Sequence, residues 1–176
     1  YDRLVREGLE DQMETLWSRA INSACAARDA HGSGRVAGSI GPLIASYRPD
    51  ICPPAAEAEE SYGDIVAALA PHVDLLLIET MSSVDQAEGA LRAVTKSGLP
   101  IWLAVSVQDF DGSKLRSGEN LAELAPVLNR HDTDAILINC SRPEAVSTAV
   151  DIAAQFGQPF GAYANGFTKI TQGFLK

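Results

Sequence analysis

Short apolar runs alternate with longer stretches of mixed character along this 176-residue chain. Each run ends at a polar residue. The stretch that follows repeats its apolar residues at a helical spacing, as a strand followed by a helix does. The runs start roughly 25–40 residues apart, which is the usual length of one βα unit. The pattern therefore predicts an α/β fold built from five such units.

Turn and capping residues set the expected boundaries. The expected strands are residues 35–40, 73–80, 100–107, 134–140 and 159–164. The expected helices are residues 4–29, 53–70, 83–96, 121–130 and 143–156. Residues 108–120 are expected to form a polar loop between the third strand and its helix.

Two architectures suit this order, a (β/α)8 TIM barrel and an open, doubly wound sheet. The third to fifth strands are nearly all apolar, which predicts a parallel sheet covered on both faces. No strand is followed by a glycine-rich phosphate loop, which disfavours the nucleotide-binding form of the open sheet. We therefore expect a TIM barrel with only about five of its eight strands present, as a single partial domain over residues 1–176. The chain starts without a methionine and inside a helical pattern, as a piece of a longer protein would.

In TIM barrels the chemistry is carried by residues at the carboxyl ends of the strands. Glu79 is the most informative of these, because it follows four apolar residues and its carboxylate needs a partner or a cationic ligand. Two interpretations stay open. Glu79 either binds a substrate ammonium group, or it forms a salt bridge or favours the start of the following helix. The other strand-end segments are 39–42, 106–109, 139–140 and 163–166.

Cys140 follows the fourth strand in the same way. A free cysteine is most often a small buried hydrophobe, and zinc takes three or four protein ligands, so Cys140 alone does not predict a metal site. The three histidines precede strands and are expected at the opposite end of the barrel. Asn139 and Asn165 also end strands, where tying down a loop is the commoner role. No strand ends in a lysine, a carboxylate pair or a Ser/His/Asp set, which disfavours Schiff-base, glycosidase and serine-hydrolase chemistry.

The net charge, the lengths of the apolar runs and the cysteines limit the expected partners and cellular compartment. The net charge of −9 repels phosphate backbones, so we expect no nucleic-acid partner. No apolar run approaches the roughly 20 residues that cross a bilayer, so we expect no membrane insertion. Cys25, Cys52 and Cys140 are far apart and odd in number, which fits a reducing, cytoplasmic protein without disulfides. A homo-oligomer stays open.

Five segments, in order, resemble blocks of the homocysteine S-methyltransferase family. They are GSIGPLIASYRPD (38–50), DLLLIETMSSVDQAEGAL (74–91), AVSVQDFDGSKLRSGEN (104–120), ILINCSRPE (136–144) and YANGF (163–167). The resemblance covers nearly the whole chain and implies a TIM barrel that transfers a methyl group from a small donor to the thiol of homocysteine, giving methionine.

The resemblance also implies a role for each strand-end residue. Cys140 would be one of three cysteine ligands of a catalytic Zn²⁺, and Glu79 would bind the homocysteine ammonium group. Thr80, Asn139 and Asn165 would complete the substrate site. The other two ligands belong to a Gly-Gly-Cys-Cys segment that these 176 residues do not contain, so we expect the chain alone to be inactive. The methyl donor stays open.

Two alternatives remain at this stage. One is another (β/α)8 enzyme, such as a lyase with an anion site at residues 163–167. The other is a barrel remnant without catalytic activity.

Overall fold

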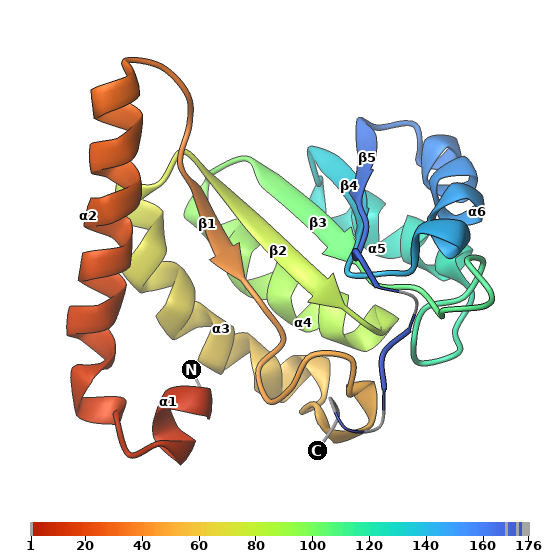
Figure 1. Cartoon of the computed structure of the whole chain (residues 1–176), viewed down its shortest axis with the longest axis horizontal. Coiled ribbons are helices and arrows are strands. Elements are labelled where there is room, and N and C mark those ends of the chain that lie inside the picture. The colour runs from red at the N-terminus through yellow and green to blue at the C-terminus, as the bar shows by residue number, and fades with distance from the viewer. Residues whose placement is uncertain (1, 168, 172, 174–176) are drawn as a thin grey trace.

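The computed structural model describes residues 2–167, 169–171 and 173. Its five strands form one parallel sheet in the order β1-β2-β3-β4-β5, so every strand pairs with its neighbour in the sequence. This is the order of successive strands in a barrel wall, and it confirms the predicted α/β fold with a partial barrel (Figure 1).

The observed elements lie close to the predicted ones. The strands are β1 (Ala37–Ile40), β2 (Leu75–Met81), β3 (Ile101–Val105), β4 (Ala135–Asn139) and β5 (Phe160–Tyr163). The α-helices are α1 (Asp2–Arg6), α2 (Met13–His31), α3 (Ala55–Leu69), α4 (Val84–Val94), α5 (Ala125–His131) and α6 (Pro143–Ala153). Short 3-10 turns are η1 (Glu10–Gln12), η2 (Pro49–Ile51), η3 (Ala70–His72), η4 (Thr95–Ser97), η5 (Leu121–Leu124) and η6 (Ala154–Phe156).

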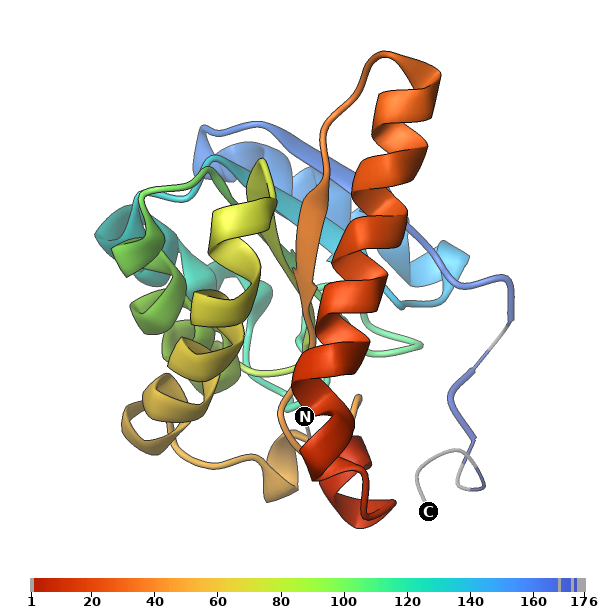
Figure 2. The ribbon, with the colours of Figure 1, turned by 90° about the vertical axis from the view of Figure 1, so that its left-hand side faces the viewer.

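The opening helix predicted over residues 4–29 is wrong in its first part. The chain forms α1, turns at Gly8 with a φ of 66°, and then enters α2 through η1. The amide of Gly8 bonds to the carbonyl of Val5, and that of Leu9 to the carbonyl of Leu4, which closes α1. Glycine adopts this left-handed conformation without steric cost. Figure 2 shows α2 running alongside β1 at the edge of the sheet.

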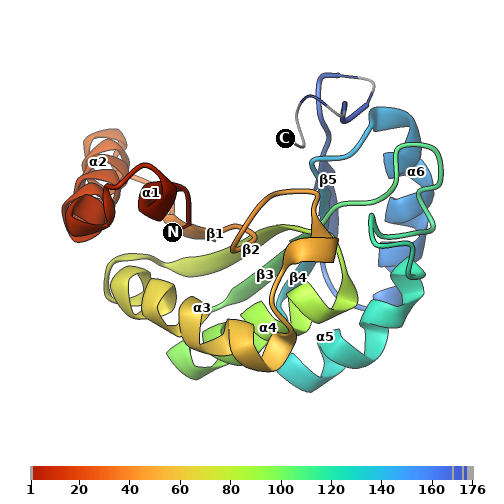
Figure 3. The ribbon, with the colours of Figure 1, turned by 90° about the horizontal axis from the view of Figure 1, so that it is seen from below.

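The sheet is curled, and α3, α4, α5 and α6 cover its outer, convex face (Figure 3). Side chains that point to these helices, such as Leu76, Ile78 and Leu103, are fully buried. The opposite, concave face carries no helix in the described part of the chain, so Leu77 and Leu137 stay partly exposed there. The sequence predicted a sheet covered on both faces, and the helices of the described residues cover the convex face only. In a closed barrel, side chains of the concave face fill the interior.

Close contact between helices α3 and α4 depends on Gly89. A Cβ atom at this position would lie 3.0 Å from both Ala55 Cα and Ala58 Cβ. Small residues on both helices let their backbones approach in this way, and the two helices then form one layer over β2 and β3 (Figure 3). Among the described residues, none of the helices combines the length and the apolar character needed to span a bilayer.

An aspartate before the apolar run of β2, and another before that of β4, fixes the register of the neighbouring strand. Asp74 accepts a hydrogen bond from the amide of Val36 at 2.7 Å, and Asp134 accepts one from the amide of Ile101, also at 2.7 Å. The backbone amide of each aspartate bonds back to the carbonyl of the same residue. Each aspartate therefore pairs twice with one residue, which fixes how its strand aligns with the strand before it.

Replacing Asp134 by alanine should lower the free energy of unfolding by about 1–3 kcal/mol, because a charge-assisted hydrogen bond to the Ile101 amide is lost. The exposed Asp151 on α6 provides the control, and Asp151→Ala should change stability by less than about 0.5 kcal/mol. Urea unfolding measures both. Equal midpoints for the two variants would contradict a role for Asp134 in strand register.

Candidate active site

A β-bulge at the carboxyl end of β2 directs two side chains towards other strands. The pairing of β2 with β3 shifts register between Ile78 and Met81, which leaves Glu79 and Thr80 in an irregular segment. Thr80 has a φ of 66°, a conformation that β-branched residues rarely adopt. Bulges of this kind are common next to active sites, where they re-aim side chains.

The Glu79 carboxylate lies between two hydroxyl groups from the two edge strands. Ser39 of β1 donates a hydrogen bond to one carboxylate oxygen, and the Tyr163 hydroxyl of β5 donates to the other at 2.8 Å. Burial and this bond to Glu79 raise the pKa of Tyr163 above that of an ordinary phenol, so its hydroxyl stays a proton donor. The two hydrogen bonds thus fix the orientation of the Glu79 carboxylate.

Glu79 has no cationic partner within the described residues: none of the ion pairs there involves it. The salt-bridge interpretation of Glu79 therefore finds no support in this part of the chain. A half-buried carboxylate held by neutral hydroxyls can still attract a cation, because its charge is not compensated locally.

Asn139 joins the end of β4 to the bulge of β2. Its side-chain oxygen accepts a hydrogen bond from the amide of Thr80 at 3.1 Å, and its nitrogen donates to the Thr80 hydroxyl at 3.1 Å. Asn139 is fully buried, so these bonds are shielded from water. The Thr80 hydroxyl lies 3.2 Å from the sulfur of Cys140 and donates to it, and the Asn139 nitrogen lies 3.5 Å from the same sulfur.

The backbone after Asn139 is also fixed. Its carbonyl accepts hydrogen bonds from the hydroxyls of Ser106 at 3.0 Å and Ser141 at 2.8 Å. Ser141 in turn accepts from the amide of Val107 through its hydroxyl, and its carbonyl accepts from the amide of Asn165. These bonds link the ends of β3, β4 and β5 and hold Cys140 with a φ of 49°, half-buried at the end of β4.

The structure adds a residue from the loop after β1 that lies outside the predicted strand-end segments. Tyr47, in the segment between β1 and η2, is buried, and the Arg116 guanidinium lies 5.2 Å from the centre of its ring. Burial and the nearby Cys140 raise the pKa of Tyr47 to about 12. The structure therefore gathers Glu79, Thr80, Asn139, Cys140 and Asn165 at one end of the sheet, and adds Tyr47 to them. Only the tertiary structure identifies Tyr47, because the loop that carries it has no periodic pattern.

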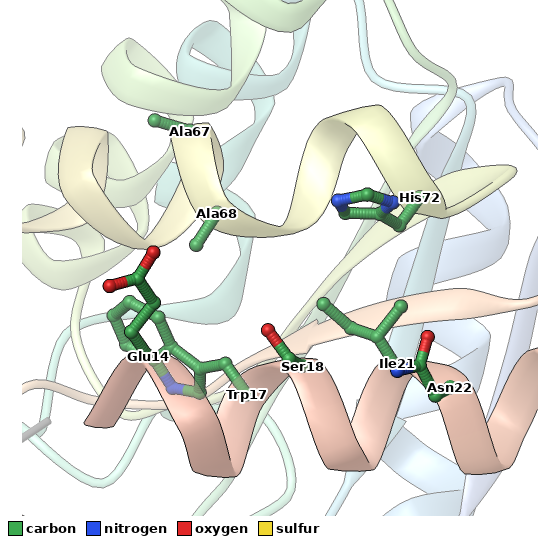
Figure 4. Close-up of a pocket in the computed structure, with 8 residues that line it drawn as sticks. All are labelled: Glu14, Trp17, Ser18, Ile21, Asn22, Ala67, Ala68 and His72. Atoms are coloured by element: carbon green, nitrogen blue, oxygen red, sulfur yellow. The ribbon is translucent and has the colours of Figure 1, made fainter. Parts of the chain in front are cut away.

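A groove elsewhere on the molecule contains none of these residues. It lies between α2 and the α3–η3 segment and has a volume of about 250 Å³, with Trp17, Ile21 and His72 among its lining residues (Figure 4). His72 precedes β2 and so lies at the opposite end of that strand from Glu79, whereas Trp17 also lines a hollow with Ser39 and Ile40 of β1.

The sequence profile of the family described as homocysteine S-methyltransferase matches residues 2–174. The chain belongs to the homocysteine S-methyltransferase family. This membership removes the alternative of an unrelated barrel enzyme such as a lyase.

Solved structures of the homocysteine methyltransferase MmuM from Escherichia coli have the same fold as this family member. The metallated form superposes with a TM-score of 0.74 at 21% identity, over 94% of this chain and 71% of that chain. The apo form superposes with a TM-score of 0.71 at 20% identity, over 90% and 70% of the respective chains. Among the curated proteins that were compared, none matches this chain in sequence.

The resemblance implies a zinc ion, and the described residues fit one part of such a site. A zinc ion in a catalytic site takes three protein ligands and keeps one open position. The Cys140 sulfur is a suitable ligand, because it is half-buried at the end of β4. Within the described residues, however, no group of three or more His, Cys, Asp or Glu side chains is arranged to hold a metal. These residues thus fit one zinc ligand rather than a whole site.

Asn139→Ala should destabilise the fold by about 2–3 kcal/mol, because the buried Thr80 amide loses its acceptor and the bulge loses its support. Asn22→Ala, on the exposed surface of α2, is the control and should leave the urea midpoint nearly unchanged. Should Asn139→Ala unfold at the wild-type urea concentration, the buried hydrogen bonds of Asn139 do not support the bulge.

Proposed function

We propose that the protein transfers a methyl group from a small donor to the thiol of homocysteine, at the carboxyl end of the sheet. The observation that carries this proposal is the pairing of two unlike groups. Glu79, a carboxylate without a cationic partner among the described residues, directly precedes Thr80, and the Thr80 hydroxyl donates a hydrogen bond to the half-buried thiol of Cys140. Family membership supports the same reaction.

Glu79 is proposed to bind the ammonium group of homocysteine. Ser39 and Tyr163 occupy one position on each carboxylate oxygen, and each oxygen keeps further lone pairs for a ligand. Because the two hydroxyls fix the carboxylate, little side-chain freedom is lost when the substrate binds. An ammonium group is favoured over a neutral one by the uncompensated charge.

Cys140 is proposed to be one of three sulfur ligands of Zn²⁺, the other two lying outside the described residues. Bound zinc keeps a coordinated thiol deprotonated and leaves a position for the substrate sulfur. Thr80 and Asn139 would orient the Cys140 sulfur, since both donate hydrogen bonds to it. Asn165 would hold the loop that lies beside the substrate.

The proposed methyl transfer is a displacement at the methyl carbon. The homocysteine thiol gives up its proton to solvent, its sulfur forms a bond to the methyl carbon, and the bond from that carbon to the donor atom breaks. The electron pair of the broken bond stays on the donor atom. The described residues bind and orient homocysteine in this scheme, and they leave the class of donor open.

The state of the three cysteines bears on the cellular compartment of the protein. Cys25, Cys52 and Cys140 are all free thiols in the structure. Thiols stay reduced in the cytoplasm, and the reaction itself needs the reduced thiol of homocysteine. We therefore place the enzyme in the cytoplasm.

In the complete protein that contains this chain, Glu79→Gln should raise the KM for homocysteine about 10- to 100-fold, with little effect on donor binding. The charge-assisted bond to the ammonium group is worth about 1.5–3 kcal/mol. Glu144→Gln, on the exposed first turn of α6, is the matched control. An unchanged KM and kcat in Glu79→Gln would remove Glu79 from the substrate site.

Cys140→Ala should remove both stoichiometric zinc and methyl transfer from the complete protein, while Cys25→Ala should keep both. Cys25 is the control because its sulfur bonds to the carbonyl of His72, at the other end of the sheet. The 176-residue chain by itself should bind zinc weakly, since one thiolate does not hold zinc against water. Metal analysis that finds one zinc per chain in Cys140→Ala would identify Cys140 as a structural residue only.

A further inference from the structure

Asp109 is a nearly buried carboxylate that joins two segments far apart in the sequence. It lies in the loop after β3, and its side chain is only 11% exposed. Its Oδ1 accepts a hydrogen bond from Arg116 Nη1 at 3.1 Å, and its Oδ2 accepts one from the backbone amide of Ile170 at 3.2 Å. A buried carboxylate is costly unless it is paired and hydrogen-bonded. Both oxygens meet that need, and one of them does so with the chain that follows β5.

Arg116 holds Asp109 from within the same loop. Its side chain is 14% exposed, and Nη1 also donates to the carbonyl of Val107 at 3.3 Å. The guanidinium lies 5.2 Å from the centre of the buried Tyr47 ring, close enough for attraction to its face. A planar guanidinium can form an ion pair at its edge and stack on a ring at the same time. The Arg116–Asp109 pair therefore also contacts the loop after β1.

The loop after β3 is anchored to the rest of the fold. The amide of Ser117 donates to the carbonyl of Ser82, just after β2, at 2.9 Å. Gly112 lies so close to α6 that a Cβ atom there would be 2.0 Å from the carbonyl oxygen of Ala145. Contacts with β2 and α6 thus hold this loop, so it can support a less regular segment.

The chain after β5 is tied at two described points at the carboxyl end of the sheet. The amide of Asn165 donates to the carbonyl of Ser141, just after β4, at 2.9 Å, and the amide of Ile170 donates to Asp109. Both residues lie beyond β5 and outside regular secondary structure. Segments of this kind open easily when few hydrogen bonds hold them, so each tie contributes to their order.

We propose that Asp109 is a positioning residue for homocysteine binding, which fixes the chain after β5 beside the substrate site, and that Arg116 holds its carboxylate for this role. Asp109 acts through that segment rather than by touching the substrate. A segment that is already ordered loses little freedom when the substrate binds, whereas a loosened one must be ordered at that moment, which weakens binding. The inference rests on the proposed function, in which Asn165 belongs to the homocysteine site.

Hydrogen exchange tests the tie itself and needs no catalysis. In the complete protein, Asp109→Ala should speed exchange of the Ile170 amide about 10- to 100-fold, because this amide loses a charged acceptor. The matched control is Asp111→Ala in the same loop, where the carboxylate accepts from the amide and hydroxyl of Ser113. This control should leave exchange at Ile170 unchanged. Equal exchange at Ile170 in Asp109→Ala and the wild type, measured by NMR, would overturn the inference.

Steady-state kinetics tests the consequence for the substrate. Asp109→Ala should raise the KM for homocysteine about 2- to 10-fold, the cost of ordering a loosened side chain, and leave kcat and the KM for the donor nearly unchanged. A purely structural role would lower the urea midpoint without this change in KM, and would overturn the inference. If Glu79→Gln raises that KM while Asp109→Ala does not, only this inference fails. A wild-type protein that does not methylate homocysteine would overturn the proposed function, and the positioning role with it.

Asp109→Asn remains informative if Asp109→Ala does not fold. The substitution keeps the size of the side chain and an acceptor oxygen but removes the charge, so exchange at Ile170 should speed up by a smaller factor. Exchange at the wild-type rate in this variant would overturn the inference.

Arg116→Met tests whether Arg116 acts through Asp109. It should also speed exchange at Ile170, and the double variant with Asp109→Ala should exchange about as fast as Asp109→Ala alone. Effects that multiply in the double variant would show that the two residues act independently, and would overturn the link between them.

Discussion

The curl of the sheet is the constraint on which the site depends. Tyr163 lies on β5 and Ser39 on β1, at opposite edges of the sheet, yet both donate hydrogen bonds to Glu79. Adjacent strands are about 4.8 Å apart, so β2 and β5 are separated by three such spacings along the sheet. The curl turns the strand ends towards a common centre, and short polar side chains can then meet there. The helices on the convex face support that curl, since the apolar side chains beneath them are fully buried.

Much of this arrangement could be predicted from the sequence because the signals are local. An apolar run that ends in a polar residue identifies both a strand and its carboxyl end, and this pattern indicates Glu79, Asn139 and Cys140 as strand-end residues. The order of the strands follows from the length of the connections between them. The resemblance to a known family then supplied roles that spacing alone left open, above all for Cys140.

The remaining features depend on contacts between distant segments. Tyr47 stands in a loop without periodicity, and its ring lies against Arg116, which is more than sixty residues away in the sequence. The break at Gly8 was missed because the apolar residues on both sides keep a helical spacing, while a single left-handed glycine is enough to end a helix. The apolar character of the strands predicted cover on both faces, and the described chain supplies the helices of one face only.

Backbone strain is concentrated where the proposed chemistry lies. Of the described residues other than glycine, four have positive φ, and three of these are Tyr47, Thr80 and Cys140. A conformation of this kind costs about 1–3 kcal/mol per residue, so the surrounding contacts must compensate for it. A hydrogen bond connects Thr80 directly to Cys140, so these two strained residues support each other. Because that cost is met when the protein folds, the Cys140 sulfur is already oriented before any ligand arrives, and binding energy need not be used to order it.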